Sequence, residues 1–142
     1  MSVLVRTAGV TVLGFAFVAC GGGAGGDGGA IKDVFRDFFQ AFEDEDAEAL
    51  ASLLSEDCEN PDVLAAEAID DFADSTLDVD VEFNITGADI RDLTETTAEA
   101  LPEGTTTVGG QEFRLDDADD PEYASLTKED GEWKLADCSI LI

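Results

Sequence analysis

The spacing of the apolar residues changes once along this chain, near residue 77, and this change limits the folds that the chain can adopt. In three segments between residues 31 and 73, apolar residues recur every three or four positions, which is typical of amphipathic helices. From residue 77 to residue 86 they alternate with polar residues, which is typical of a strand with one buried face. Helices that precede strands predict an α+β domain, with the helices packed on one face of a sheet.

Three helices are expected before this change. The first is predicted over residues 31–43, and the acidic residues 43–46 end it. Asp46 is a suitable N-cap for a second helix over residues 47–54. Asn60 is a preferred N-cap residue and Pro61 suits the first helical position, so a third helix is predicted to run to about residue 73.

The second half of the chain predicts about five antiparallel strands. Gly87 is expected to end the first strand or to place a bulge in it, and residues 102–104 are expected to form a turn. Gly109-Gly110 and Asp130-Gly131 suit two-residue hairpin turns. Five strands are expected at residues 77–86, 105–108, 111–115, 123–129 and 132–142. A weaker sixth segment, residues 93–101, is expected to be a strand, with a helix at residues 98–100 as the alternative.

The first 19 residues have the layout of a secretory signal peptide. A short start with one basic residue, Arg6, precedes a run of small and apolar residues from residue 8 to residue 18. This run is shorter than the roughly 20 apolar residues that a membrane-spanning helix needs. Residues 1–19 are therefore predicted to be absent from the mature protein.

The end of this segment resembles a bacterial lipobox, which reads leucine, a small residue, glycine or alanine, and cysteine. Val18, Ala19 and Cys20 match that pattern, and Phe17 replaces the leucine. Ordinary cleavage after Ala19 is the alternative, but Phe17 argues against it more strongly because that cleavage needs a small residue there. The resemblance implies cleavage before Cys20 and several acyl chains on it, which give stable anchoring.

This organisation divides the chain into three parts. Residues 1–19 are the signal peptide, residues 20–29 are the lipidated cysteine with a flexible glycine-rich tether, and residues 30–142 are a single domain. The expected location is the extracytoplasmic side of the cell membrane, with the lipid on Cys20 as the only contact with the bilayer.

Two cysteines remain once Cys20 is lipidated, so only one intramolecular pairing is possible. Disulfides form and persist outside the cytoplasm. A helix layer packed on a sheet can bring Cys58, after the second helix, close to Cys138 on the last strand. We predict a Cys58–Cys138 disulfide, with two buried free thiols as the alternative.

The chain contains no histidine. Its absence excludes Ser-His-Asp and Cys-His catalysis and the usual mixed zinc sites.

The net charge of −27 is the most unusual feature of the composition. Without residues 1–19 the chain keeps six basic and 34 acidic residues, a formal charge of −28. This charge excludes nucleic acid and anionic headgroups as partners. It indicates an acidic surface adapted to salt, with attraction of cations or basic proteins as the alternative.

The loop over residues 116–122 is a weak calcium candidate. It lacks the spacing and the glycine of an EF-hand, so we expect a solvated acidic loop and no metal site. Its candidate ligands are Asp116, Asp117, Asp119 and Asp120.

Three segments resemble the nuclear transport factor 2-like superfamily, and in particular small exported lipoproteins with that cone-shaped α+β fold. They are residues 34–42 with their four phenylalanines, the segment Asp46-Ala47-Glu48-Ala49-Leu50, and the hairpin over residues 126–135 with Asp130-Gly131-Glu132-Trp133-Lys134. The resemblance frames residues 30–142 but matches nothing in residues 88–122. It implies three N-terminal helices packed on a curved, mostly antiparallel sheet of about five strands.

The resemblance leaves several functions open, because the superfamily includes isomerases, dehydratases, cyclases and non-catalytic binding domains. Catalytic members aim an Asp, Tyr or His into an apolar pocket between helices and sheet, and here Tyr123 is the only tyrosine. Asp78, Asp80 and Glu82 alternate with the apolar residues of a strand, so they are expected to face solvent. A catalytic acid needs an apolar position that raises its pKa.

We therefore expect a non-catalytic domain, without a cofactor, that binds a small apolar solute or an envelope protein. An isomerase- or dehydratase-type enzyme acting in the cone pocket is the alternative, and a homodimer formed by the exposed sheet face is a third. The aromatic residues that could line the pocket, or simply form the core, are Phe35, Phe38, Phe42, Phe72, Phe83 and Trp133.

Overall fold

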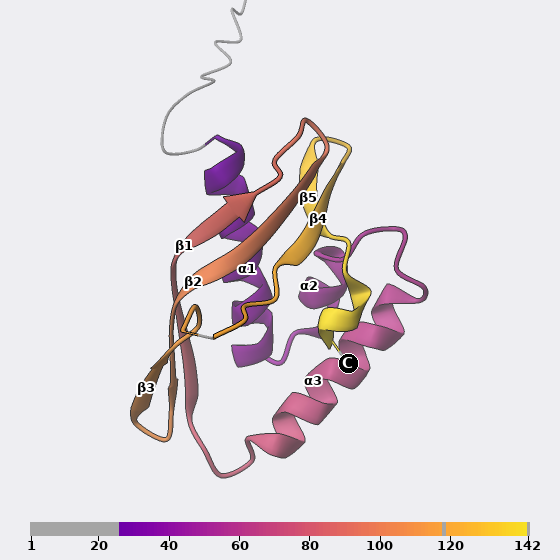
Figure 1. The fold of residues 1–142 in the computed structure, drawn as a ribbon. Helices are drawn as coiled ribbons and strands as arrows, with labels where there is room; N and C mark the ends of the chain where they lie inside the picture. The colour runs from indigo at the N-terminus through magenta and orange to yellow at the C-terminus, as the bar shows by residue number, and fades with distance from the viewer. Residues whose placement is uncertain (1–25, 118, 142) are drawn as a thin grey trace, which may run out of the picture.

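A computed structural model of the chain describes residues 26–117 and 119–141 (Figure 1). Three helices precede five strands, so the α+β class predicted from the sequence is confirmed. The elements are α1 (Asp27–Glu43), α2 (Ala47–Ser52), α3 (Pro61–Ser75), β1 (Val81–Arg91), β2 (Thr97–Val108), β3 (Gln111–Arg114), β4 (Ala124–Glu129), β5 (Glu132–Leu135) and a 3₁₀ helix η1 (Cys138–Leu141). No helix of these described residues is long and apolar enough to cross a membrane.

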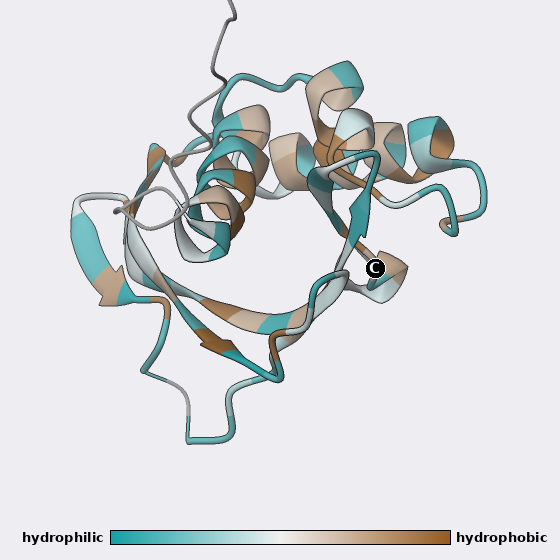
Figure 2. Ribbon diagram, turned by 90° about the horizontal axis from the view of Figure 1, so that it is seen from above, coloured by the Kyte–Doolittle hydropathy of each residue, from teal (hydrophilic) through white to brown (hydrophobic). Residues whose placement is uncertain are grey.

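The strands form one antiparallel sheet in the order β1-β2-β4-β5, and β3 also pairs with β2. β2 is the central strand, because its residues 97–100 pair with β4 and its residues 105–108 pair with β3. Seen from above, the sheet curves around α1, which lies on its concave side (Figure 2). The result is a half-barrel, which confirms the curved antiparallel sheet that was expected from the sequence.

Residues 102–104 lie within β2 and do not form the predicted turn. Gly104 has φ +151°, and a Cβ there would lie 2.1 Å from the carbonyl oxygen of Asn84 on β1. Only glycine permits this approach. Pro102 is tolerated because β2 has no second neighbouring strand at that position. The predicted bulge is present opposite this region, between Ile85 and Gly87.

The core lies between the inner face of α1 and the part of the sheet where β2 pairs with β4. Phe35 is 1% exposed, and the inward alternation of β2 buries the small residues Ala98 and Ala100 against the helix. Full burial of a large apolar side chain contributes about 1.5–3 kcal/mol, so α1 and the sheet stabilise each other. The other core residues of these elements are Ile31, Val34, Phe38, Ala41, Ala124, Leu126, Trp133 and Leu135.

α1 begins at Asp27, inside the segment that we expected to be tether. Contacts of the Asp27 side chain explain this early start of the helix. Its Oδ1 accepts hydrogen bonds from Lys128 Nζ at 2.9 Å and from Trp133 Nε1 at 3.1 Å. These contacts hold the first turn of α1 against the β4–β5 hairpin, although two glycines follow Asp27 and disfavour a helix.

The first strand begins at Val81, later than predicted. Leu77 and Val79 are 77% and 40% exposed, and they belong to the turn between α3 and β1. Val81 pairs with Val108, the last residue of β2 before the turn at Gly109-Gly110. Residues before Val81 have no partner strand at this end of the sheet, so the alternation alone does not extend the strand.

The caps of the two later helices differ. Asp46 Oδ1 accepts a hydrogen bond from the backbone N–H of Ala49 at 2.9 Å, so the predicted cap of α2 is confirmed. Asn60 has φ +54° and its side chain makes no capping bond, so α3 begins with Pro61 at its first turn but without the predicted side-chain cap.

The structure contains the predicted disulfide between Cys58 and Cys138, with Cα atoms 5.7 Å apart. Cys138 lies in η1 and not on the last strand, because β5 ends at Leu135. A second link holds the same loop: Ser55, which is fully buried, donates a hydrogen bond to Glu129, whose carboxylate also accepts from the Glu56 N–H at 3.2 Å. The loop after α2 is therefore fixed to both the C-terminus and β4.

We expect that replacing both cysteines, Cys58→Ala with Cys138→Ala, lowers the free energy of unfolding. The bond closes a loop with a sequence separation of 80, for which chain entropy gives about 4.5 kcal/mol as an upper value. Urea unfolding measures the loss. Reductant should lower the stability of the wild-type protein to that of the double variant and leave the variant unchanged; equal effects on both would contradict the prediction.

We expect Asp27→Asn to destabilise the protein only above acidic pH. The hydrogen bond from Lys128, and then that from Trp133, lowers the pKa of Asp27 below 3.8. A lowered folded-state pKa adds stability above the unfolded value, and this stability is lost as the pH falls through the folded pKa. Thermal unfolding should therefore separate the two proteins at pH 6, and the difference should shrink as the pH falls below 3.8. Asp70→Asn, on the exposed face of α3, should show no such convergence.

Candidate functional site

Five phenylalanine rings from α1, α3 and β1 pack together near the start of β1. They are Phe38, Phe39, Phe42, Phe72 and Phe83. Their centroids lie 4.6 to 6.3 Å apart, and Phe39 of α1 and Phe72 of α3 both approach Phe83 of β1. Phe42 links the two helices through contacts with Phe38 and Phe72. The sequence analysis proposed Phe42, Phe72 and Phe83 as pocket residues, and the structure brings these three together.

The other three predicted pocket residues belong to the core. Phe35, Phe38 and Trp133 are 1%, 6% and 4% exposed. Phe35 and Phe38 lie on the face of α1 that packs on the sheet, and Trp133 packs against the same core. The alternative interpretation, that these aromatic residues form the core, is correct for half of the set.

The pairing of three strands extends this aromatic cluster across the concave face. Phe83 pairs with Thr106, and Thr106 pairs with Phe113 of β3. Buried Ala98 and Ala100 define the inward face of β2, and alternation places Thr106 and Val108 on the same face. We call Phe83, Thr106, Val108 and Phe113 the open wall, because Val108 and Phe113 are 37% and 50% exposed.

The sequence analysis missed Thr106, Val108 and Phe113. A usable signal was present, since a two-residue turn at Gly109-Gly110 fixes the pairing of Val108 with Gln111 and of Thr106 with Phe113. Both glycines have positive φ, 56° and 81°, as such a turn requires. The sequence did not reveal that the β2–β3 hairpin extends beyond the end of α1, where no helix covers it.

The open wall contains no acid. Every inward-facing position on the described strands β1 to β5 lacks aspartate and glutamate. Glu82 lies on the outer face, as predicted, whereas Asp78 and Asp80 are exposed in the turn before β1. The side-chain oxygen of Thr106 is buried and has no hydrogen-bond partner among the described residues, so this wall is apolar apart from one hydroxyl.

Tyr123 lies on the opposite, outer side of the sheet. Its hydroxyl donates a hydrogen bond to Asp89, which raises the pKa of Tyr123. The guanidinium of Arg91 lies 3.7 Å from the ring centroid and also pairs with Glu99 at 2.8 Å. Each of these polar groups is satisfied by its neighbours, and none of them faces the open wall.

Asp116 of the acidic loop forms an ion pair with Arg114. Arg114 donates to both carboxylate oxygens of Asp116, at 3.1 and 2.6 Å, which lowers the pKa of Asp116 and raises that of Arg114. Asp117, Asp119 and Asp120 are exposed. Among residues 26–117 and 119–141, no group of three or more Cys, Asp or Glu side chains is arranged to hold a metal ion. Cys20 lies outside the described residues.

No family model matches this chain, and no curated protein sequence matches it. Solved structures match its fold. A protein of unknown function from Mycobacterium tuberculosis superposes with a TM-score of 0.56 at 17% identity, over 75% of this chain and 66% of that one. The chain thus spans just under two thirds of that protein's length.

Two proteins of unknown function from Nostoc punctiforme, described as having a cystatin-like fold, also match. One has a TM-score of 0.55 at 19% identity and the other 0.51 at 14%, each over 75% of this chain and over 71% and 83% of their own. Identities this low establish a similarity of fold alone. They are consistent with the nuclear transport factor 2-like architecture that the sequence predicted, and they leave the activity undetermined.

Proposed function

We propose that this protein is an exported lipoprotein, anchored through Cys20, whose domain binds a small apolar solute on the open wall. The observation that supports solute binding is the exposure of Val108 and Phe113 on a concave surface next to the Phe83 cluster. Exposed apolar groups gathered on a concave surface favour binding because burying them against a ligand removes apolar area from water.

The absence of carboxylates from the inward positions of the described strands supports binding over acid–base chemistry. An isomerase- or dehydratase-type mechanism needs a group that moves a proton within reach of the substrate. The four residues of the open wall offer only the hydroxyl of Thr106, whose oxygen is buried and which stays protonated at neutral pH. The carboxylate of Glu43, at the end of α1, borders the wall, but it accepts a hydrogen bond from the Phe83 N–H at 2.6 Å. A non-catalytic binding domain is therefore the function that this geometry supports best.

We expect the neutral dye Nile red to bind residues 20–142, and Phe113→Ser to weaken this binding about three- to tenfold. Full burial of an apolar ring contributes about 1.5–3 kcal/mol, and a ligand can bury only the half of Phe113 that is exposed; 1.4 kcal/mol is tenfold in affinity. Leu93→Ser is the matched control, because Leu93 is 48% exposed on the loop between β1 and β2. Fluorescence titration measures both affinities, and equal weakening by the two substitutions would contradict the proposal.

The anchor is supported by the sequence of residues 1–20. Six residues separate Cys20 from Asp27, so the tether reaches at most about 25 Å. The start of α1 would then lie close to the bilayer, and the open wall, at the opposite end of the sheet, would face away from it (Figure 1).

We expect Cys20→Ser to release the protein from membranes or to leave it unprocessed, because the acyl chains attach to that sulfur. Cell fractionation and intact-mass measurement follow the two outcomes. Cys58→Ser is a control that removes a cysteine without touching the anchor. An unmodified Cys20 in the membrane fraction would show that the lipid is not the anchor.

A further inference from the structure

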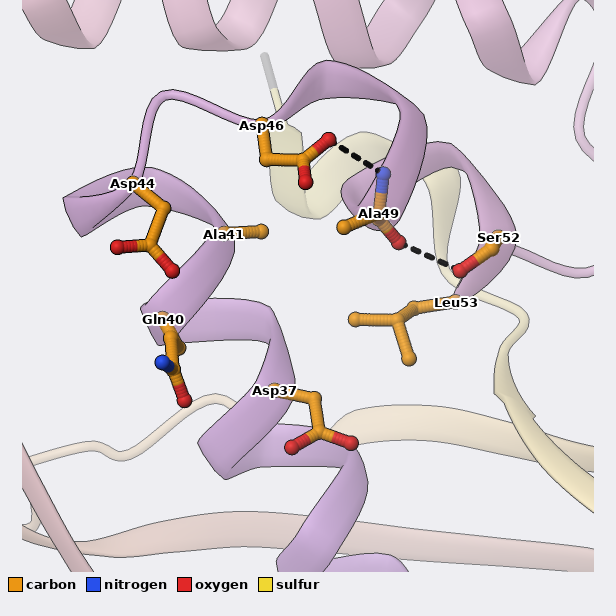
Figure 3. Close-up of a pocket in the computed structure, with 8 residues that line it drawn as sticks. All are labelled: Asp37, Gln40, Ala41, Asp44, Asp46, Ala49, Ser52 and Leu53. Atoms are coloured by element: carbon orange, nitrogen blue, oxygen red, sulfur yellow. Dashed lines mark hydrogen bonds between the residues drawn. The ribbon is translucent and has the colours of Figure 1, made fainter.

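A groove runs along the side of α1 that faces α2 and β5, separate from the open wall. It consists of two hollows of about 270 and 480 Å³ that share Asp37, Ser52 and Leu53 and are therefore continuous. Figure 3 shows the first hollow, where α1 and α2 face each other. One wall is a stripe of α1 from Ala30 to Asp44, which is about 21 Å long. That length fits about six residues of extended chain.

The far wall of the groove ends in an open strand edge. On the side of β5 away from β4, the backbone N–H of Leu135 donates to the carbonyl of Leu53 at 2.8 Å. The carbonyl of Leu135 accepts from the N–H of Ser55, also at 2.8 Å. In this hairpin Leu135 and Trp133 occupy equivalent pairing positions, so the backbone N–H and C=O of Trp133 point to the same outer edge. Trp133 lines the groove, and no described residue is hydrogen-bonded to these two groups. An extended chain in the groove could pair with them.

The side chains of the groove select the charge of its occupant. Its floor is apolar, with Val34, Ala41, Ala49 and Leu53. Its sides carry the carboxylates of Asp33, Asp37, Asp44, Asp46 and Glu132. The one lysine of the lining, Lys134, already donates to the carbonyl of Ser52 at 2.6 Å and lies 3.5 Å from Glu132. Arg36, beside the groove, pairs with Asp33 at 2.8 Å and lies 3.6 Å from Asp37. The five carboxylates outnumber these two cations, so the groove keeps a net negative charge and is apolar at its base.

We propose that this groove binds an extended basic segment of a partner protein. Apolar side chains of the segment lie on the floor, lysine or arginine side chains meet Asp37 and Asp44, and its backbone pairs with Trp133. Charge complementarity selects this partner, because basic side chains complement the lining and long-range attraction by a chain of charge −27 favours their approach. The proposal depends neither on the lipid anchor nor on solute binding.

The probe is a fluorescein-labelled peptide of eight residues that alternates lysine and valine, titrated with the full chain in a neutral detergent at about 0.15 M NaCl. We expect measurable binding by fluorescence anisotropy, and no binding of the same peptide with glutamate in place of lysine. Asp37→Asn with Asp44→Asn should weaken binding at least tenfold. Asp70→Asn with Asp71→Asn, on the exposed face of α3, removes the same charge outside the groove and should change it less than twofold.

Two further measurements test the groove itself. Ala49→Arg places a cation between α1 and α2 and should abolish binding, with thermal unfolding to confirm that the variant is folded. A peptide N-methylated at every backbone amide, valines and lysines alike, cannot donate to the strand edge and should bind at least fivefold more weakly. Equal losses in the two double-asparagine variants, unchanged binding by the folded Ala49→Arg variant, or unchanged binding of the N-methylated peptide would overturn the proposal.

Discussion

The close approach of β1 and β2 at Gly104 is the constraint on which the shape of this domain depends. The carbonyl of Asn84 occupies the space that a side chain would need, and the bulge between Ile85 and Gly87 lies beside it. A bulge bends a strand and increases its twist. Because β2 passes through this point without interruption, its two ends serve different parts of the sheet: the first pairs with β4 under α1, and the second pairs with β3 beyond the helix.

This division explains why one continuous sheet has both a closed and an open half. α1 covers the part where β2 presents Ala98 and Ala100, whose small side chains let the helix approach closely. Past Gly104 the inward residues are Thr106 and Val108, and α1 has ended at Glu43. Glu43 accepts a hydrogen bond from the N–H of Phe83 at 2.6 Å, which fixes the end of the helix at the border of the open wall.

Directed bonds hold the helices to the sheet in a chain with strong self-repulsion. Asp27 binds two side chains of the β4–β5 hairpin, Glu129 binds the loop after α2, and the Cys58–Cys138 disulfide binds that loop to η1. Most of the remaining acids lie on the surface, where they raise the attraction for cations and basic chains. The open wall and the acidic groove lie on different sides of α1 and suit different ligands, one apolar and one basic.

Local chemistry in the sequence determined the kinds of elements, their order, both hairpin turns, the cap of α2 and the cysteine pair. Each of these depends on residues close in sequence, except the cysteine pair, which was predicted by assigning Cys20 to the proposed lipid anchor. The tertiary structure decided the start of β1 at Val81, the continuation of β2 through Pro102 and Gly104, and the start of α1 at Asp27, because each depends on a partner distant in sequence. It also decided which aromatic residues are buried: Phe35 and Phe113 both sit in apolar patterns, but α1 covers the sheet at Phe35 and ends before it reaches Phe113.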